Sequence, residues 1–110
     1  MMHNNVYERV IARYNDPFSF LRDMVSMIDD NIDIKMTSKK ITLKHKDTKS
    51  TLYSIIINPY EGLTLKDDFI THLDKEEDEH LHMILKAFIN NASSSEIYES
   101  LRADEILFDV

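Results

Sequence analysis

The sequence has no cysteine, no tryptophan and a single glycine, Gly62, among its 110 residues. Without cysteine there are no disulfides, iron–sulfur clusters, thiolate zinc sites or cysteine nucleophiles, and the composition suits a reducing compartment. Loops that bind phosphate use several glycines so that backbone N–H groups can approach the anion. The single glycine therefore argues against nucleotide-binding enzymes of the P-loop and Rossmann types.

Long hydrophobic runs are also missing. No apolar stretch approaches the roughly 18 residues that span a bilayer, and Glu8, Arg9 and Arg13 interrupt the segment where a signal peptide has its apolar core. A chain of this length, with 43% hydrophobic residues, is expected to form one domain around one modest core. We therefore expect a single domain over residues 1–110, located in the cytoplasm and without a membrane segment.

The net charge of −7 is distributed unevenly along the chain. Residues 35–60 contain six lysines and one aspartate, a local net of +5. Residues 61–110 contain four basic and thirteen acidic side chains, a local net of −9. An acidic chain with a basic middle segment is the strongest global feature of this sequence.

The spacing of apolar residues predicts two short amphipathic helices at the start of the chain, over residues 4–15 and 15–31. The second helix is expected to begin with Asp16 as its N-cap and Pro17 at its first position, where the missing N–H of proline costs nothing. The opening of the protein is therefore predicted to be helical.

The periodicity then changes to two, which predicts strands over residues 32–37, 40–46 and 50–58. The connectors between these strands are short, so an antiparallel meander is favoured over crossover connections. Residues 63–73 leave three interpretations open: a fourth strand, a strand followed by a helical turn, or an early helix start.

Asp74, with Glu77 three residues later, resembles a capping box and predicts a helix that ends in the polar segment 90–95. Another helix is predicted over residues 94–102. The expected fold is α+β, with two N-terminal helices, an antiparallel meander of three to four strands, and two C-terminal helices packed on one face of the sheet.

Residues 72–83, HLDKEEDEHLHM, contain three histidines and five carboxylates. On a helix, His80 and His82 point about 160° apart and do not ligate one metal together. Glu77-x-x-His80 has the spacing of a di-iron motif, but that site needs a second such motif. No metal or cofactor is therefore expected. Carboxylates in the first turns complement the positive end of the helix dipole, although five in six residues is more than capping needs.

The excess of carboxylates has two explanations, and the sequence leaves both open. One is a solvated face that aids solubility. The other is a docking surface for a basic groove, in which carboxylates take the place of phosphates. The predicted docking residues share a position on or beside the C-terminal helices: Asp67, Asp68, Asp74, Glu76, Asp78, Glu79, Glu96 and Glu99.

The basic middle segment also has two interpretations. Lysines on the predicted hairpins contact nucleic-acid phosphates in one of them, and protect exposed sheet edges against aggregation in the other. The residues concerned are Lys35, Lys39, Lys40, Lys44 and Lys46. Residues 84–102 have the outline of a helix-turn-helix, but Glu96 and Glu99 lie where a recognition helix meets phosphates, which argues against DNA reading.

No catalytic constellation is visible. Nothing marks a strained turn around a serine nucleophile, and no carboxylate lies in an apolar stretch that would raise its pKa into a working range. We therefore expect a binding protein rather than an enzyme.

Three stretches carry a resemblance to a known class of proteins: KDD at 66–68, DKEEDE at 74–79, and the strands IDIKMT, KITLKHK and TLYSIIIN. In layout and charge, over most of its length, the chain resembles small acidic inhibitors encoded by phages and mobile elements, such as anti-CRISPR proteins. The resemblance implies a carboxylate surface that occupies the nucleic-acid-binding site of a partner nuclease.

Three hypotheses follow for function. The leading one is a non-catalytic inhibitor whose acidic C-terminal helices engage a basic surface of a partner protein, with no membrane partner. The alternative is a small nucleic-acid-binding transcriptional regulator that uses the lysine-rich hairpins. The third is an accessory subunit that buries exposed apolar surface in a homodimer.

Overall fold

A computed structural model describes residues 5–66, 73–93 and 96–99 of the chain. The elements follow in the order α1 (Val6–Ile11), α2 (Pro17–Ile28), β1 (Ile32–Met36), β2 (Lys40–His45), β3 (Thr51–Asn58), β4 (Gly62–Lys66) and α3 (Lys75–Asn91). Residues 96–99 are helical as well. The structure is therefore of the α+β class, as the sequence predicts.

Both predicted N-caps are confirmed. The Asp16 side chain accepts a hydrogen bond from the backbone N–H of Phe18 at 3.0 Å, with Pro17 as the first residue of α2. The Asp74 side chain accepts from the backbone N–H of Glu77 at 2.9 Å, and α3 begins at the next residue. Each cap satisfies a donor that the first turn of a helix leaves unpaired.

The four strands form one antiparallel sheet in the order β1-β2-β3-β4, which is the predicted meander. The open question about residues 63–73 is resolved in part, because residues 62–66 are strand β4 and residues 67–72 lie outside the described part of the chain. The turn before β4 uses Gly62 at φ +86, a left-handed conformation that glycine adopts without steric cost.

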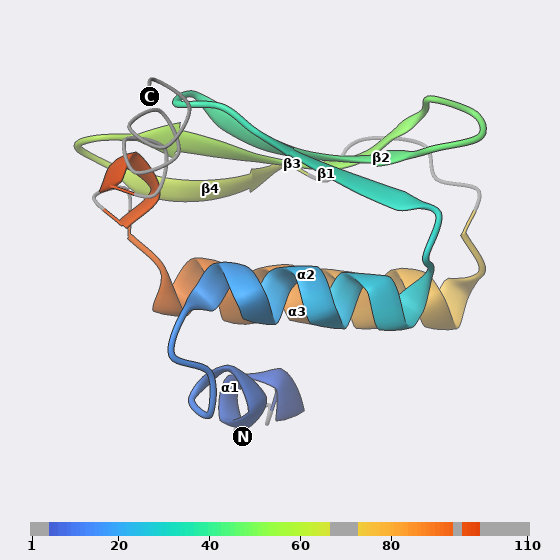
Figure 1. Cartoon of the computed structure of the whole chain (residues 1–110), viewed down its shortest axis with the longest axis horizontal. Coiled ribbons are helices and arrows are strands. Elements are labelled where there is room, and N and C mark those ends of the chain that lie inside the picture. The colour runs from blue at the N-terminus through green and yellow to red at the C-terminus, as the bar shows by residue number, and fades with distance from the viewer. Residues whose placement is uncertain (1–4, 67–72, 94–95, 100–110) are drawn as a thin grey trace, which may run out of the picture.

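Helices α2 and α3 run antiparallel to each other on one face of the sheet, and α1 lies on their far side (Figure 1). This arrangement differs from the expectation that two C-terminal helices share the sheet, since α2 takes the place beside α3. Four strands about 4.8 Å apart make a face wider than one helix of about 10 Å covers. Two long helices are therefore needed to cover the sheet. One of them, α2, precedes the strands in the chain, and the other, α3, follows them.

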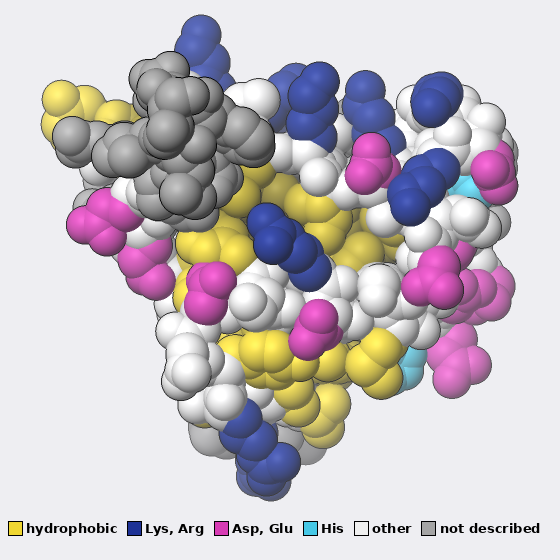
Figure 2. All heavy atoms as spheres, in the orientation of Figure 1, with side chains coloured by type: hydrophobic (Ala, Val, Ile, Leu, Met, Phe, Trp, Pro, Cys, Tyr) yellow, Lys and Arg dark blue, Asp and Glu magenta, His cyan; other side chains and the backbone are white. Residues whose placement is uncertain are grey.

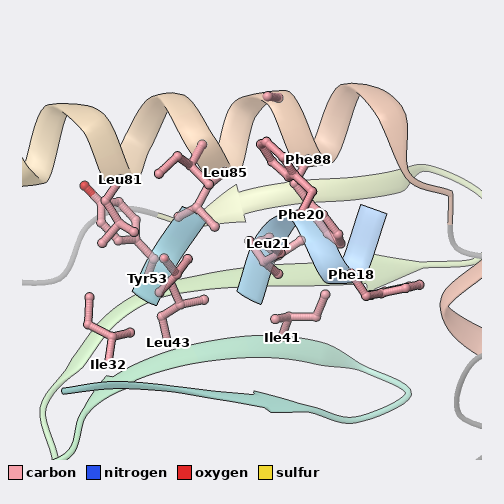
Figure 3. Packing of buried hydrophobic residues seen from close by; sticks show 14 of the residues in the cluster. Phe18, Phe20, Leu21, Ile32, Ile41, Leu43, Tyr53, Leu81, Leu85 and Phe88 are labelled. Carbon is pink, nitrogen blue, oxygen red and sulfur yellow. The ribbon is translucent and has the colours of Figure 1, made fainter. Parts of the chain in front are cut away.

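The core lies between the sheet and these two helices (Figure 3). Phe20 of α2 and Phe88 of α3 are fully buried, as are Ile41, Leu43 and Ile55 of the central strands. Among the described residues, no helix is both long enough and apolar enough to cross a bilayer.

Candidate functional site

Carboxylates converge at the end of the molecule where α3 begins, and we call Asp29, Asp74, Glu76, Glu77 and Glu79 the acidic end. Four of these residues belong to the N-cap and first turns of α3. Asp29 comes from the segment after α2, which ends beside the start of α3 (Figure 1). Figure 2 shows a group of acidic side chains at this end.

The Asp74–Glu77 pair shows how closely these negative charges approach. The pKa of Glu77 is raised, mainly by its hydrogen bond with the Asp74 side chain, and further by partial burial and by the charges of Asp74, Asp29 and Glu76. The pKa of Asp74 is lowered, mainly because the backbone N–H of Glu77 donates to its carboxylate. The two carboxyl groups are therefore shifted in opposite directions, so that Asp74, the cap, ionises more readily than Glu77.

A hollow of about 460 Å³ opens within the acidic end. Its polar lining includes His45 of β2, whose Nε2 lies 3.7 Å from a carboxylate oxygen of Asp29. The Nδ1 atom of His45 is buried and has no hydrogen-bond partner. The remaining lining comes from the segment between β2 and β3, from β3, and from the start of α3 with the two residues before it. These residues are Thr48, Ser50, Leu52, Leu73, Asp74 and Glu77.

Asp78 has a structural contact that the sequence did not predict. Its carboxylate accepts a 2.6 Å hydrogen bond from the hydroxyl of Tyr53, a residue of β3 that is 4% exposed. Asp78 therefore ties α3 to the sheet, whereas Glu76 and Glu79 are exposed to solvent.

The predicted acidic face is not one surface. Glu96 and Glu99 lie beyond the C-terminal end of α3, where they border Asn15 and Asp16 at the start of α2. Since α3 has 17 residues, its length separates them from the acidic end by about 25 Å. The hydroxyl of Ser93 bonds with both the backbone N–H and the carboxylate of Glu96, a capping arrangement that explains this glutamate locally.

Two further predicted residues, Asp67 and Asp68, lie outside the described part of the chain. The histidines of α3 have separate neighbours. His80 Nδ1 hydrogen-bonds with the hydroxyl of Tyr7 in α1 at 2.8 Å, and the ring of His82 packs edge-on against Tyr53. Within the described residues, no three His, Asp or Glu side chains are placed to hold a metal ion.

The lysines gather on the face of the sheet opposite the helices. Register places Lys35, Lys40 and Lys44 on this face, since each alternates with residues that point into the core. Lys39 is in the β1–β2 turn and Lys46 follows the end of β2, so neither belongs to the strand face.

Lys66 of β4 joins the three lysines, because it pairs with Ser54 on the same side of the sheet. Lys66 was not among the predicted lysines, because the periodicity of residues 63–73 left strand and helix both open. The alternation of Leu63 and Leu65 with Thr64 and Lys66 is the signal that would have found it. We call Lys35, Lys40, Lys44 and Lys66 the lysine face.

The two charged surfaces remain unpaired with each other. In the parts of the chain that the structure describes, no Lys or Arg nitrogen lies within ion-pair distance of an Asp or Glu oxygen. Within the described residues, the negative charge at one end and the positive charge on the sheet therefore lack ion-pair partners of the opposite sign from lysine or arginine and from carboxylates, respectively.

Comparison of the chain with protein-family models, curated proteins and solved structures found no match.

Proposed function

We propose that this protein is a non-catalytic binding module whose acidic end occupies a basic surface of a partner protein. The partner is a nucleic-acid-binding protein or nuclease, and the carboxylates take the positions of phosphates, as in the phage-encoded inhibitors that the chain resembles. One observation carries the proposal: the acidic end gathers carboxylates from two separate segments around one hollow without a lysine or arginine partner among the described residues.

Electrostatics supports a cationic partner at this place. The pKa of Glu77 is raised first by its hydrogen bond with Asp74 and then by burial and by the charges of Asp74, Asp29 and Glu76. An approaching ammonium or guanidinium group offsets the repulsion among these carboxylates. Exposed Glu76 and Glu79 are positioned to steer such a partner and to form contacts at the rim of the interface.

The structure changes which variants test the idea. Asp78 is unsuitable, because removing its carboxylate breaks the hydrogen bond with Tyr53 and so changes stability as well as surface charge. The double variant Glu76→Gln/Glu79→Gln removes two exposed charges of the acidic end. Its matched control, Glu61→Gln/Glu99→Gln, removes two exposed charges elsewhere and gives the same net charge.

The experiment captures partners from a nuclease-treated lysate on immobilised protein, purifies the captured protein, and measures its affinity for each variant. We expect the acidic-end variant to lose affinity about tenfold or more and the control to lose much less. Nucleic acid should also displace the protein from its partner. Equal losses in the two variants, or no competition by nucleic acid, would contradict the proposal.

A further inference from the structure

Two small hydroxyl side chains lie side by side at the centre of the face of the sheet that points away from α1, α2 and α3. Thr42 of β2 pairs with Ser54 of β3, and they are 6% and 5% exposed. The same row continues outward to Lys35 on β1 and Lys66 on β4, the two edge strands. With strands about 4.8 Å apart, the backbones of these two lysines are separated by about 14 Å.

Lys40 and Lys44 complete the arrangement along β2. Each lies two residues from Thr42, which places their backbones about 7 Å to either side of it. All four lysines are exposed, so their ammonium groups surround the short, buried side chains of Thr42 and Ser54. Lys and Arg side chains line the sheet side of the molecule in Figure 2.

The described strand residues on this face carry a positive net charge. Asp33 pairs with Lys44 and is the one carboxylate among the described strand residues on this side. Ile56, 38% exposed, lies opposite Lys40 and is the one large apolar side chain there among the described strand residues. Helices α1, α2 and α3 all lie on the opposite side of the sheet (Figure 1).

Protection of sheet edges explains two of the four lysines of the lysine face. Lysine on an edge strand discourages pairing with another chain, and this accounts for Lys35 and Lys66. Lys40 and Lys44 belong to β2, a central strand whose two edges are already paired. Their presence points to a ligand that lies across the face.

We propose that the lysine face binds the sugar-phosphate backbone of a nucleic-acid duplex without reading its sequence. A DNA duplex carries one negative charge per about 1.7 Å of its axis, so lysine positions spread over about 14 Å can contact several phosphates at once. This inference goes beyond the proposed function and does not depend on it, since it concerns the opposite charge on a different surface.

The composition of the face defines what it recognises. The described strand residues include no arginine for bidentate contacts with base edges, and Tyr53, the aromatic residue among them, points toward the helices rather than outward (Figure 3). These strand residues therefore offer single strands no aromatic surface for stacking. A single exposed isoleucine also gives little apolar surface for insertion into a membrane.

The experiment measures binding of a labelled DNA duplex, the matching single strand and vesicles containing phosphatidylserine, over a range of salt concentrations. Four lysine–phosphate contacts predict that log K falls with log salt with a slope of about −3 to −4 for the duplex. The variant Lys35→Gln/Lys66→Gln should bring the slope to about −2 and weaken binding roughly tenfold or more.

A matched control and a gain-of-binding variant make the test specific. Lys75→Gln/Lys86→Gln makes the same change in net charge at two exposed positions of α3, and should have little effect on duplex binding. Asp33→Asn removes the carboxylate beside Lys44 and should strengthen binding, whereas Glu79→Gln should do so far less. Thermal unfolding of each variant reports whether the fold is intact.

Each alternative outcome overturns the proposal. Absence of duplex binding at about 50 mM salt, where phosphate contacts are strong, excludes the duplex as the ligand. Preferential binding to the single strand or to vesicles identifies a different partner class. Equal weakening in the two double-lysine variants places the contacts outside the lysine face.

Discussion

The hydroxyl of Tyr53 donates a 2.6 Å hydrogen bond to the carboxylate of Asp78, which joins the sheet to α3 across 25 positions of sequence. A hydrogen bond from a largely buried phenol to a charged group contributes more than an average neutral pair. We expect Tyr53→Phe to lower the free energy of unfolding by about 1–2 kcal/mol, measured by urea denaturation.

A double-mutant cycle tests the same contact. Asp78→Asn should destabilise the protein as well, and the double variant should lose less than the sum of the two single losses. Additive losses would show that the hydroxyl and the carboxylate contribute through other neighbours.

Phe88 is expected to be the most sensitive position of the helix layer. It is fully buried, and its ring lies edge-on to Phe18 at 5.8 Å between centroids. Phe88→Ala should lower the free energy of unfolding by about 3–5 kcal/mol, measured by urea or thermal unfolding. The substitution removes apolar contacts and also leaves a cavity. Met27→Ala, on a side chain that is 76% exposed, is the control and should leave stability nearly unchanged.

The Asp74–Glu77 pair predicts a pH-dependent effect. A raised folded-state pKa means that Glu77 favours the folded state while protonated, and that this advantage is lost as the pH rises through the folded-state pKa. Glu77→Gln should therefore raise Tm at pH 7 and leave it almost unchanged at about pH 3, where the glutamate is protonated in both states. A Tm gain that is equal at both pH values would refute the electrostatic cause.

Helix α1 should be the least protected helix in hydrogen exchange. Ile11 is its one buried residue, and polar contacts hold much of the rest. The two oxygens of the Glu8 carboxylate accept hydrogen bonds from the side-chain amides of Asn90 and Asn91 at 2.9 and 2.7 Å. Glu8→Ala should accelerate amide exchange in α1 while α2 and α3 keep their protection. Glu61→Ala is the control, and unchanged exchange in α1 would contradict the role given to Glu8.

Several features of this protein were predictable because their causes are local. Asp16 and Asp74 cap their helices through hydrogen bonds to backbone groups two and three residues away. The period-two alternation of β1 to β3 depends only on which side of a strand each residue faces. The carboxylates from Asp74 to Glu79 were also visible as a group, because all five lie within six positions of the chain.

The composition of the two charged surfaces was less predictable, because it depends on distant contacts. Asp29 reaches the acidic end only because α2 and α3 run antiparallel, so the end of one meets the start of the other. The role of Asp78 depends on Tyr53, which is distant in the chain. The role of Glu96 depends on a cap at Ser93 that the apolar periodicity did not indicate.

The helix starts at Asp16 and Asp74, the meander and the uneven distribution of charge follow from residues close together in the chain. Three other features depend on the three-dimensional packing: α2 shares the sheet face with α3, Glu99 lies far from Glu76, and Lys66 joins Lys35 around Thr42 and Ser54. Strand register and helix packing make those choices, because they bring together residues that no local pattern connects.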